Sequence, residues 1–210
     1  MTAHAHDVNT GLLQAALMWQ LMMAGMMLPV TAPWLRAAFK LVEAQSAYAR
    51  FVHTALFSTG YVLVWTVFSV FAATTQIVLR SAHLLGDHGA LQRPMAGAVL
   101  IAAGLFQFSP LKHACLAHCR NPLTFFLTHW RSGSPGLFRM GVSHGMYCVG
   151  CCWALMATAF AVGVMNLAWM GVLMLSSCAE QILPGGRWIA TSIGVGFIAW
   201  GVHLVELNFR

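Results

Sequence analysis

Hydrophobic positions in this chain form long blocks, and polar positions collect in the short segments between them. Six apolar runs approach the roughly 20 residues that a helix needs to cross a bilayer. These runs occupy residues 12–32, 55–79, 95–111, 141–162, 165–182 and 188–207. The pattern predicts an all-α fold, a polytopic membrane helix bundle with about six transmembrane helices.

The connections between the runs predict a single domain. Residues 1–11 precede the first apolar run and are expected to form a flexible N-terminal tail, while residues 12–207 are expected to form one helical transmembrane domain. Only a few residues around Val164 separate the fourth run from the fifth. Such a short connection predicts a tight helical hairpin.

Composition supports a membrane protein. The 210 residues are 59% hydrophobic and 8% charged, with a mean hydropathy of +0.72, whereas a soluble domain carries about 25% charged residues. The net charge of +6 therefore indicates membrane topology rather than nucleic-acid binding. The lipid bilayer is the first expected partner.

The basic residues predict the orientation of the bundle. With the N-terminus outside, eight of them fall on one side, namely Arg36, Lys40, Arg50, Lys112, Arg120, Arg131, Arg139 and Arg187. The other side holds Arg80, Arg93 and Arg210. Because cytoplasmic loops are enriched in Lys and Arg, we expect a multi-pass protein of the bacterial inner membrane with both termini outside.

Three cysteines lie close together in the fourth run. The segment HGMYCVGCCWALM places His144, Cys148, Cys151 and Cys152 at positions i, i+4, i+7 and i+8, which form one stripe on a helix. We expect this stripe to begin at the cytoplasmic end of the helix. Packing of small residues beside the neighbouring glycines is the structural alternative.

A second group of donors follows the third run. The segment SPLKHACLAHCRNP contains His113, Cys115, His118 and Cys119, and a short helix between its two prolines would put both thiols on one face. We expect both groups to lie at the same membrane boundary, together with the sixth cysteine, Cys178.

Charged neighbours accompany these thiols. Lys112 and Arg120 flank the second group, where cations favour the thiolate form; contact with lipid headgroups is the alternative. Glu180 falls near the same predicted boundary, where it could pair with a boundary cation or bind a metal itself. Solvation at the helix end is the alternative, and it is slightly favoured.

Methionines form two further stripes. Met18, Met22 and Met26 are spaced by four residues in the first run. Met170, Met174 and Cys178 have the same spacing in the fifth run. Thiols and thioethers are soft ligands that select Cu(I), while imidazole suits copper and zinc. Ordinary packing is the alternative for methionine. The candidate metal ligands of the chain are Cys115, Cys119, Cys148, Cys151, Cys152, His144, His113 and His118, with copper favoured and zinc as the alternative.

The cysteine segments also carry a resemblance. AAGLFQFSPLKHACLAHCRNP and GVSHGMYCVGCCWALMATAFAVGVMNLAWM resemble an uncharacterised bacterial family of predicted metal-binding integral membrane proteins, over roughly residues 17–205. The resemblance implies a functional core made of Lys112, Cys115, Cys119, Arg120, His144, Cys148, Cys151 and Cys152.

Three functions remain open on the sequence. The favoured hypothesis is a copper-handling membrane protein that binds the ion at one membrane boundary and exchanges it with a metal-donating or metal-receiving protein. The alternatives are an accessory subunit of a larger membrane complex with a structural metal, and a membrane thiol–disulfide oxidoreductase in which Cys148 and Cys151 exchange with Cys115 and Cys119. The chain lacks the P-loop, HExxH and CxxCH patterns, so no enzyme class is assigned.

Overall fold

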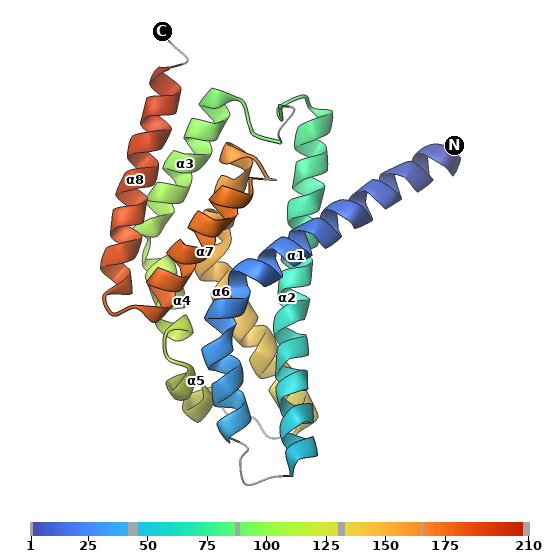
Figure 1. Ribbon diagram of the computed structural model, residues 1–210, viewed down its shortest axis with the longest axis vertical. Helices are drawn as coiled ribbons and strands as arrows, with labels where there is room; N and C mark the ends of the chain where they lie inside the picture. The colour runs from blue at the N-terminus through green and yellow to red at the C-terminus, as the bar shows by residue number, and fades with distance from the viewer. Residues whose placement is uncertain (1, 42–45, 87–88, 130–132, 165, 208–210) are drawn as a thin grey trace.

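The computed structural model of the protein describes residues 2–41, 46–86, 89–129, 133–164 and 166–207, with side chains from residue 11 to 40 in the first range. These residues form eight helices (Figure 1). The helices are α1 (Thr2–Leu41), α2 (Ala47–Ser81), α3 (Arg93–Gln107), α4 (Pro110–Cys119), α5 (Pro122–His129), α6 (Ser134–Val162), α7 (Leu167–Ile182) and α8 (Gly186–Glu206). The all-α class is confirmed. Helix α1 begins at Thr2, within the segment expected to be a tail.

The predicted number of six spans is wrong for the part of the chain that the structure describes. Four helices are long and apolar enough to cross a membrane, namely α2, α6, α8 and residues 11–40 of α1. The predicted fifth span becomes α7, whose 16 residues extend about 24 Å, short of a hydrocarbon core of about 30 Å. The predicted span was too long because it began at residue 165, whereas Asn166 caps α7 and the helix begins at Leu167.

The third predicted span is broken. Helices α3 and α4 meet at 66°, and they add a fifth span only if the bent pair counts as one. Pro110 cannot donate a backbone hydrogen bond to a continuing helix, and Ser109 caps the new helix by accepting a hydrogen bond from the Lys112 backbone N–H. The break turns α4 out of the line of α3 and toward α6.

Local signals also end α6 and begin α7. Gly163 follows α6 with a φ of 115°, a conformation that suits glycine, and the Asn166 side chain caps α7 by accepting from the Trp169 backbone N–H. The connection therefore lies where the hairpin was expected, around Val164.

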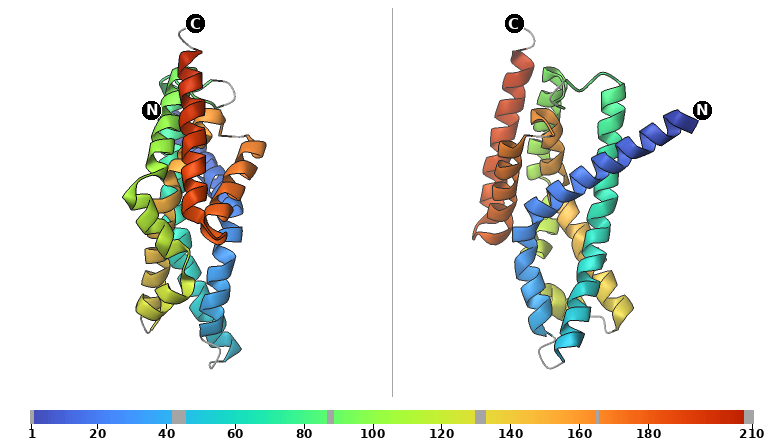
Figure 2. Two further views of the ribbon diagram at one scale, coloured as in Figure 1. Left: turned by 90° about the vertical axis from the view of Figure 1, so that its left-hand side faces the viewer. Right: turned by 45° about the vertical axis from the view of Figure 1, so that its right-hand side comes forward.

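Glycines bring the helices of the bundle into close contact. Helices α3 and α8 run side by side (Figures 1 and 2), and a Cβ on Gly97 or Gly201 would collide with the other glycine's carbonyl oxygen. A Cβ on Gly60 of α2 would likewise collide with backbone atoms of α6, and a Cβ on Gly141 of α6 would collide with backbone atoms of α2. Close approach at small residues is the usual way in which membrane helices pack. It places α6 in the centre of the bundle, between α2 and α3.

Candidate metal centre

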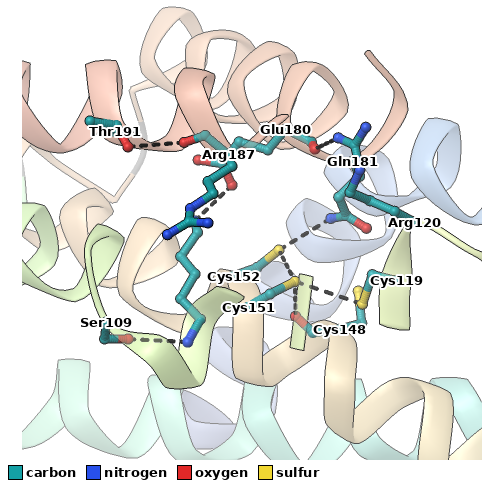
Figure 3. A network of polar contacts seen from close by, with 11 residues as sticks. Ser109, Cys119, Arg120, Cys148, Cys151, Cys152, Glu180, Gln181, Arg187 and Thr191 are labelled. Atoms are coloured by element: carbon teal, nitrogen blue, oxygen red, sulfur yellow. Dashed lines mark hydrogen bonds and ion pairs between the residues drawn. The ribbon is translucent and has the colours of Figure 1, made fainter. Parts of the chain in front are cut away.

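Four buried thiols from two helices meet in the interior of the bundle. Cys119 comes from α4, and Cys148, Cys151 and Cys152 come from α6; none is more than 3% exposed. The Sγ atom of Cys151 lies 3.8 Å from that of Cys119 and 3.3 Å from that of Cys152. Cys148 lies beside the other three thiols, as Figure 3 shows. We call these four residues the thiol cluster.

The thiol cluster forms because α4 packs closely on α6. The α6 cysteines share a helix face, as their spacing predicts. Gly150 leaves room for α4 on the neighbouring part of α6, since a Cβ there would lie 2.9 Å from the Cys115 Sγ atom. Cys115 is buried against this glycine, next to the thiol cluster.

Polar groups from three other helices hold the thiols in place. The Tyr61 hydroxyl of α2 lies 3.4 Å from the Cys148 Sγ atom, and the Gln181 side-chain amide of α7 donates to the Cys152 Sγ atom at 3.4 Å (Figure 3). The indole N–H of Trp34 in α1 donates to the Cys119 carbonyl oxygen at 3.1 Å. These three contacts were not predicted, although a glutamine within an apolar helix is itself a signal of function.

A buried ion pair lies beside the thiol cluster. Lys112 Nζ of α4 donates to a Glu180 carboxylate oxygen of α7 at 2.7 Å, and the two side chains are 0% and 1% exposed. Arg120 donates to the carbonyl oxygens of Glu180 and Leu183. Glu180 is thus paired with a buried cation instead of being solvated at a helix end, which is the interpretation that the sequence favours. Lys112 is enclosed by protein and does not contact lipid headgroups.

The candidate histidines lie outside the thiol cluster. His144 is buried in an aromatic stack, with its ring centroid 3.6 Å from that of Trp34 and 5.2 Å from that of Tyr61, and its Nε2 atom has no hydrogen-bond partner among the described residues. His113 and His118 are half-buried on α4.

Two further expectations need correction. The cysteine stripe was expected at the end of its helix, but α6 begins at Ser134, so Cys148 is the central residue of this 29-residue helix. Convergence of all six cysteines was also expected. Four of them form the thiol cluster and Cys115 adjoins it, while Cys178 is half-buried on α7 and makes none of the contacts found for the cluster within the described chain.

The methionine stripes face the interior of the molecule. Met22, Met23, Met26 and Met27 are buried. Met23 and Met27 line an apolar cavity of about 150 Å³ between α1 and α2, which Tyr61 also lines. Met18, Met22 and Met170 line a groove between α1 and α7. These positions are compatible both with packing and with soft-metal binding.

The thiols contact one another rather than surrounding a central point. Among the described residues, no group of three or more His, Cys, Asp or Glu side chains is arranged to hold a metal ion as it stands. Two sulfurs that bind one tetrahedral ion at about 2.3 Å lie about 3.8 Å apart, which is close to the Cys119–Cys151 separation. The Sγ atoms of Cys119 and Cys151 are therefore spaced as two ligands of one ion would be.

The fold and the thiol cluster define an apolar all-α protein with soft donors enclosed in its interior. Residues 16–204 match the model of the PpoB2 family, described as copper chaperones. This match covers most of the chain, so the protein belongs to the PpoB2 copper chaperone family. No curated protein and no solved structure matches the chain.

Proposed function

We propose that the protein is an integral membrane copper chaperone that binds Cu(I) at the thiol cluster and passes it to a receiving protein. The observation that carries this proposal is the convergence of four buried thiols from α4 and α6. Membership of a copper chaperone family supports it independently.

The chemistry of the donors suits Cu(I). Thiolates are soft ligands and select Cu(I) over hard cations, and a buried cluster also limits access of water and oxidants to the ion. Cys119, Cys148, Cys151 and Cys152 are the proposed primary ligands. Cys115 and His144 lie next to them and could complete the site when an ion enters.

The apolar helices support a place in the bacterial inner membrane, with residues 12–207 as one membrane domain. Four helices, or five with the bent pair, have the length and composition of membrane spans. Arg36, Lys40, Arg50 and Arg139 lie near the ends of α1, α2 and α6 that point the same way (Figure 1). By the positive-inside rule, this end faces the cytoplasm.

Metal analysis of purified protein tests the copper proposal. We expect the wild-type chain, loaded with Cu(I) under reducing conditions and then washed with a chelator that removes weakly held copper, to retain at least one copper ion. The double variant C148S/C151S should retain less than a tenth of it. The matched control is C178S, which alters a thiol outside the cluster and should bind as the wild type does. Full copper retention by the double variant would disprove the proposed ligands.

The same experiment separates the two other hypotheses. Stoichiometric zinc that Cu(I) does not displace would indicate a structural metal in a larger assembly. Loss of free thiols without metal would indicate disulfide exchange. Exchange requires a partner's sulfur to reach an attacking thiolate, and Cys148 and Cys151 are at most 1% exposed, so the structure favours metal binding.

A further inference from the structure

A small pocket that contains two histidines opens on the outer side of α4 and α5, away from the thiol cluster. Its volume is about 160 Å³, and its lining includes His118 of α4 and His129 of α5 together with Asn121, Thr124 and Thr128. His129 was not among the ligands predicted from the sequence. The pocket places two imidazole rings 6.5 Å apart between centroids.

The hydrogen bonds of His118 determine which of its nitrogens is free. The Nδ1 atom lies 2.9 Å from the carbonyl oxygen of Ala114, and a carbonyl oxygen can only accept. Nδ1 therefore carries the proton, and in the neutral ring the lone pair is on Nε2. A metal-binding histidine characteristically donates its other ring N–H to such an oxygen.

The same reasoning applies to His129 through Thr128. The Thr128 hydroxyl donates its only proton to the Thr124 carbonyl oxygen at 2.8 Å, so it accepts from the His129 Nδ1 atom, 2.8 Å away. The lone pair of neutral His129 is again on Nε2. Neither Nε2 atom has a hydrogen-bond partner among the described residues.

Stacking holds both rings in position. His118 lies 4.3 Å from the Tyr147 ring at an angle of 7°, and His129 lies 5.0 Å from the Phe125 ring at 16°. Two imidazoles that bind one ion from opposite sides at about 2.0 Å have centroids about 6.3 Å apart. The observed separation of the two rings, 6.5 Å, is close to this value.

We propose that His118 and His129 form a surface site for Cu(I), at which the ion is exchanged between the thiol cluster and a partner or solvent. His118 precedes Cys119 in α4, and its ring stacks on Tyr147, which precedes Cys148 in α6. One histidine of the site is thus next in sequence to an enclosed thiol, Cys119, and it contacts the residue before a second one, Cys148. Two imidazoles hold copper less tightly than several thiolates, which suits exchange. The exchange role rests on the proposed function, whereas Cu(I) binding by the two histidines does not.

Cu(I) titration of the full chain against a chromophoric chelator tests the site itself. In the C148S/C151S variant we expect one weakly held Cu(I) per chain, with affinity reduced at least tenfold by H129N. The matched control is H203N, which changes an exposed histidine on α8 and should leave the affinity unchanged. Absence of the weak ion, or equal effects of H129N and H203N, would overturn the site.

Transfer kinetics test the exchange role. With the thiols intact, H118N/H129N should leave the copper content at equilibrium unchanged but slow transfer from the chelator about tenfold, while H203N should not. Unchanged transfer would overturn the exchange role even if the histidines bind Cu(I). One outcome separates the two proposals. If the wild type binds no more copper than C148S/C151S, and H129N abolishes copper binding in both proteins, the thiol proposal fails and the histidine site stands.

Discussion

At the scale of single residues, glycines determine how closely the helices approach. A Cβ at Gly141 of α6 would collide with the carbonyl oxygen of Phe57 in α2, and one at Gly145 would lie 2.9 Å from the Val64 side chain. Backbone atoms cannot rotate away as a flexible side chain can. Tyr61, which contacts Cys148, is on the same stretch of α2, so this approach also positions a neighbour of the thiol cluster.

We therefore expect G141A to destabilise the protein by about 1–3 kcal/mol, the usual cost of overpacking. Thermal or denaturant unfolding in detergent measures the effect. G196A is the control, because nothing lies within 4 Å of a Cβ at Gly196 of α8. If both variants unfold alike, the contact between α2 and α6 does not depend on the absent side chain.

At the scale of elements, the Lys112–Glu180 ion pair joins α4 to α7. Both side chains are buried, and Arg120 adds hydrogen bonds to the last turn of α7 and the residue after it. Gly186, at the start of α8, leaves the space that the Arg120 guanidinium occupies. The broken helix and the short helix α7 are thus attached to each other beside the thiols.

Removing one partner of this pair should cost more than removing both. K112M leaves the Glu180 carboxylate buried without its cation, and we expect the free energy of unfolding to fall by about 3–5 kcal/mol. The double variant K112M/E180L replaces the pair with apolar side chains and should recover most of this loss. Comparable instability in both variants would show that α4 and α7 need the ion pair itself.

At the scale of the whole molecule, the ends of α1, α2 and α6 that point the same way carry basic residues. The start of α1 and the end of α8 lie toward the upper end in Figure 1, while α5 and the ends of α1 and α2 that carry Lys40 and Arg50 lie at the lower end. Arg131 and Arg210, which entered the charge count, lie outside the described residues.

This arrangement predicts a topology. We expect alkaline phosphatase fused after residue 210 to be active, because only the exported enzyme is, and the same reporter fused after residue 44 to be inactive. A fluorescent protein that folds only in the cytoplasm should give the opposite pattern at the two sites. Activity at residue 44 alone would reverse the proposed orientation and move the basic end outside.

The sequence by itself determined the properties that depend on local spacing. Long apolar runs predicted helices, and the intervals among Cys148, Cys151 and Cys152 predicted one helix face, because helical periodicity relates residues a few positions apart. The scarcity of charge in apolar segments marked Glu180 as an informative residue, but it did not determine what Glu180 contacts.

Only the tertiary structure decided which of those faces meet. Tyr61 and Gln181 contact thiols from α2 and α7, and Trp34 of α1 donates to the backbone carbonyl oxygen of Cys119. His129 lies opposite His118 on a separate helix. The length of α7 and the bend before α4 likewise reduced six expected spans to four or five. The physical reason is that a hydrophobic pattern specifies that a face is buried, whereas its partner depends on close glycine contacts and packing between residues distant in the chain.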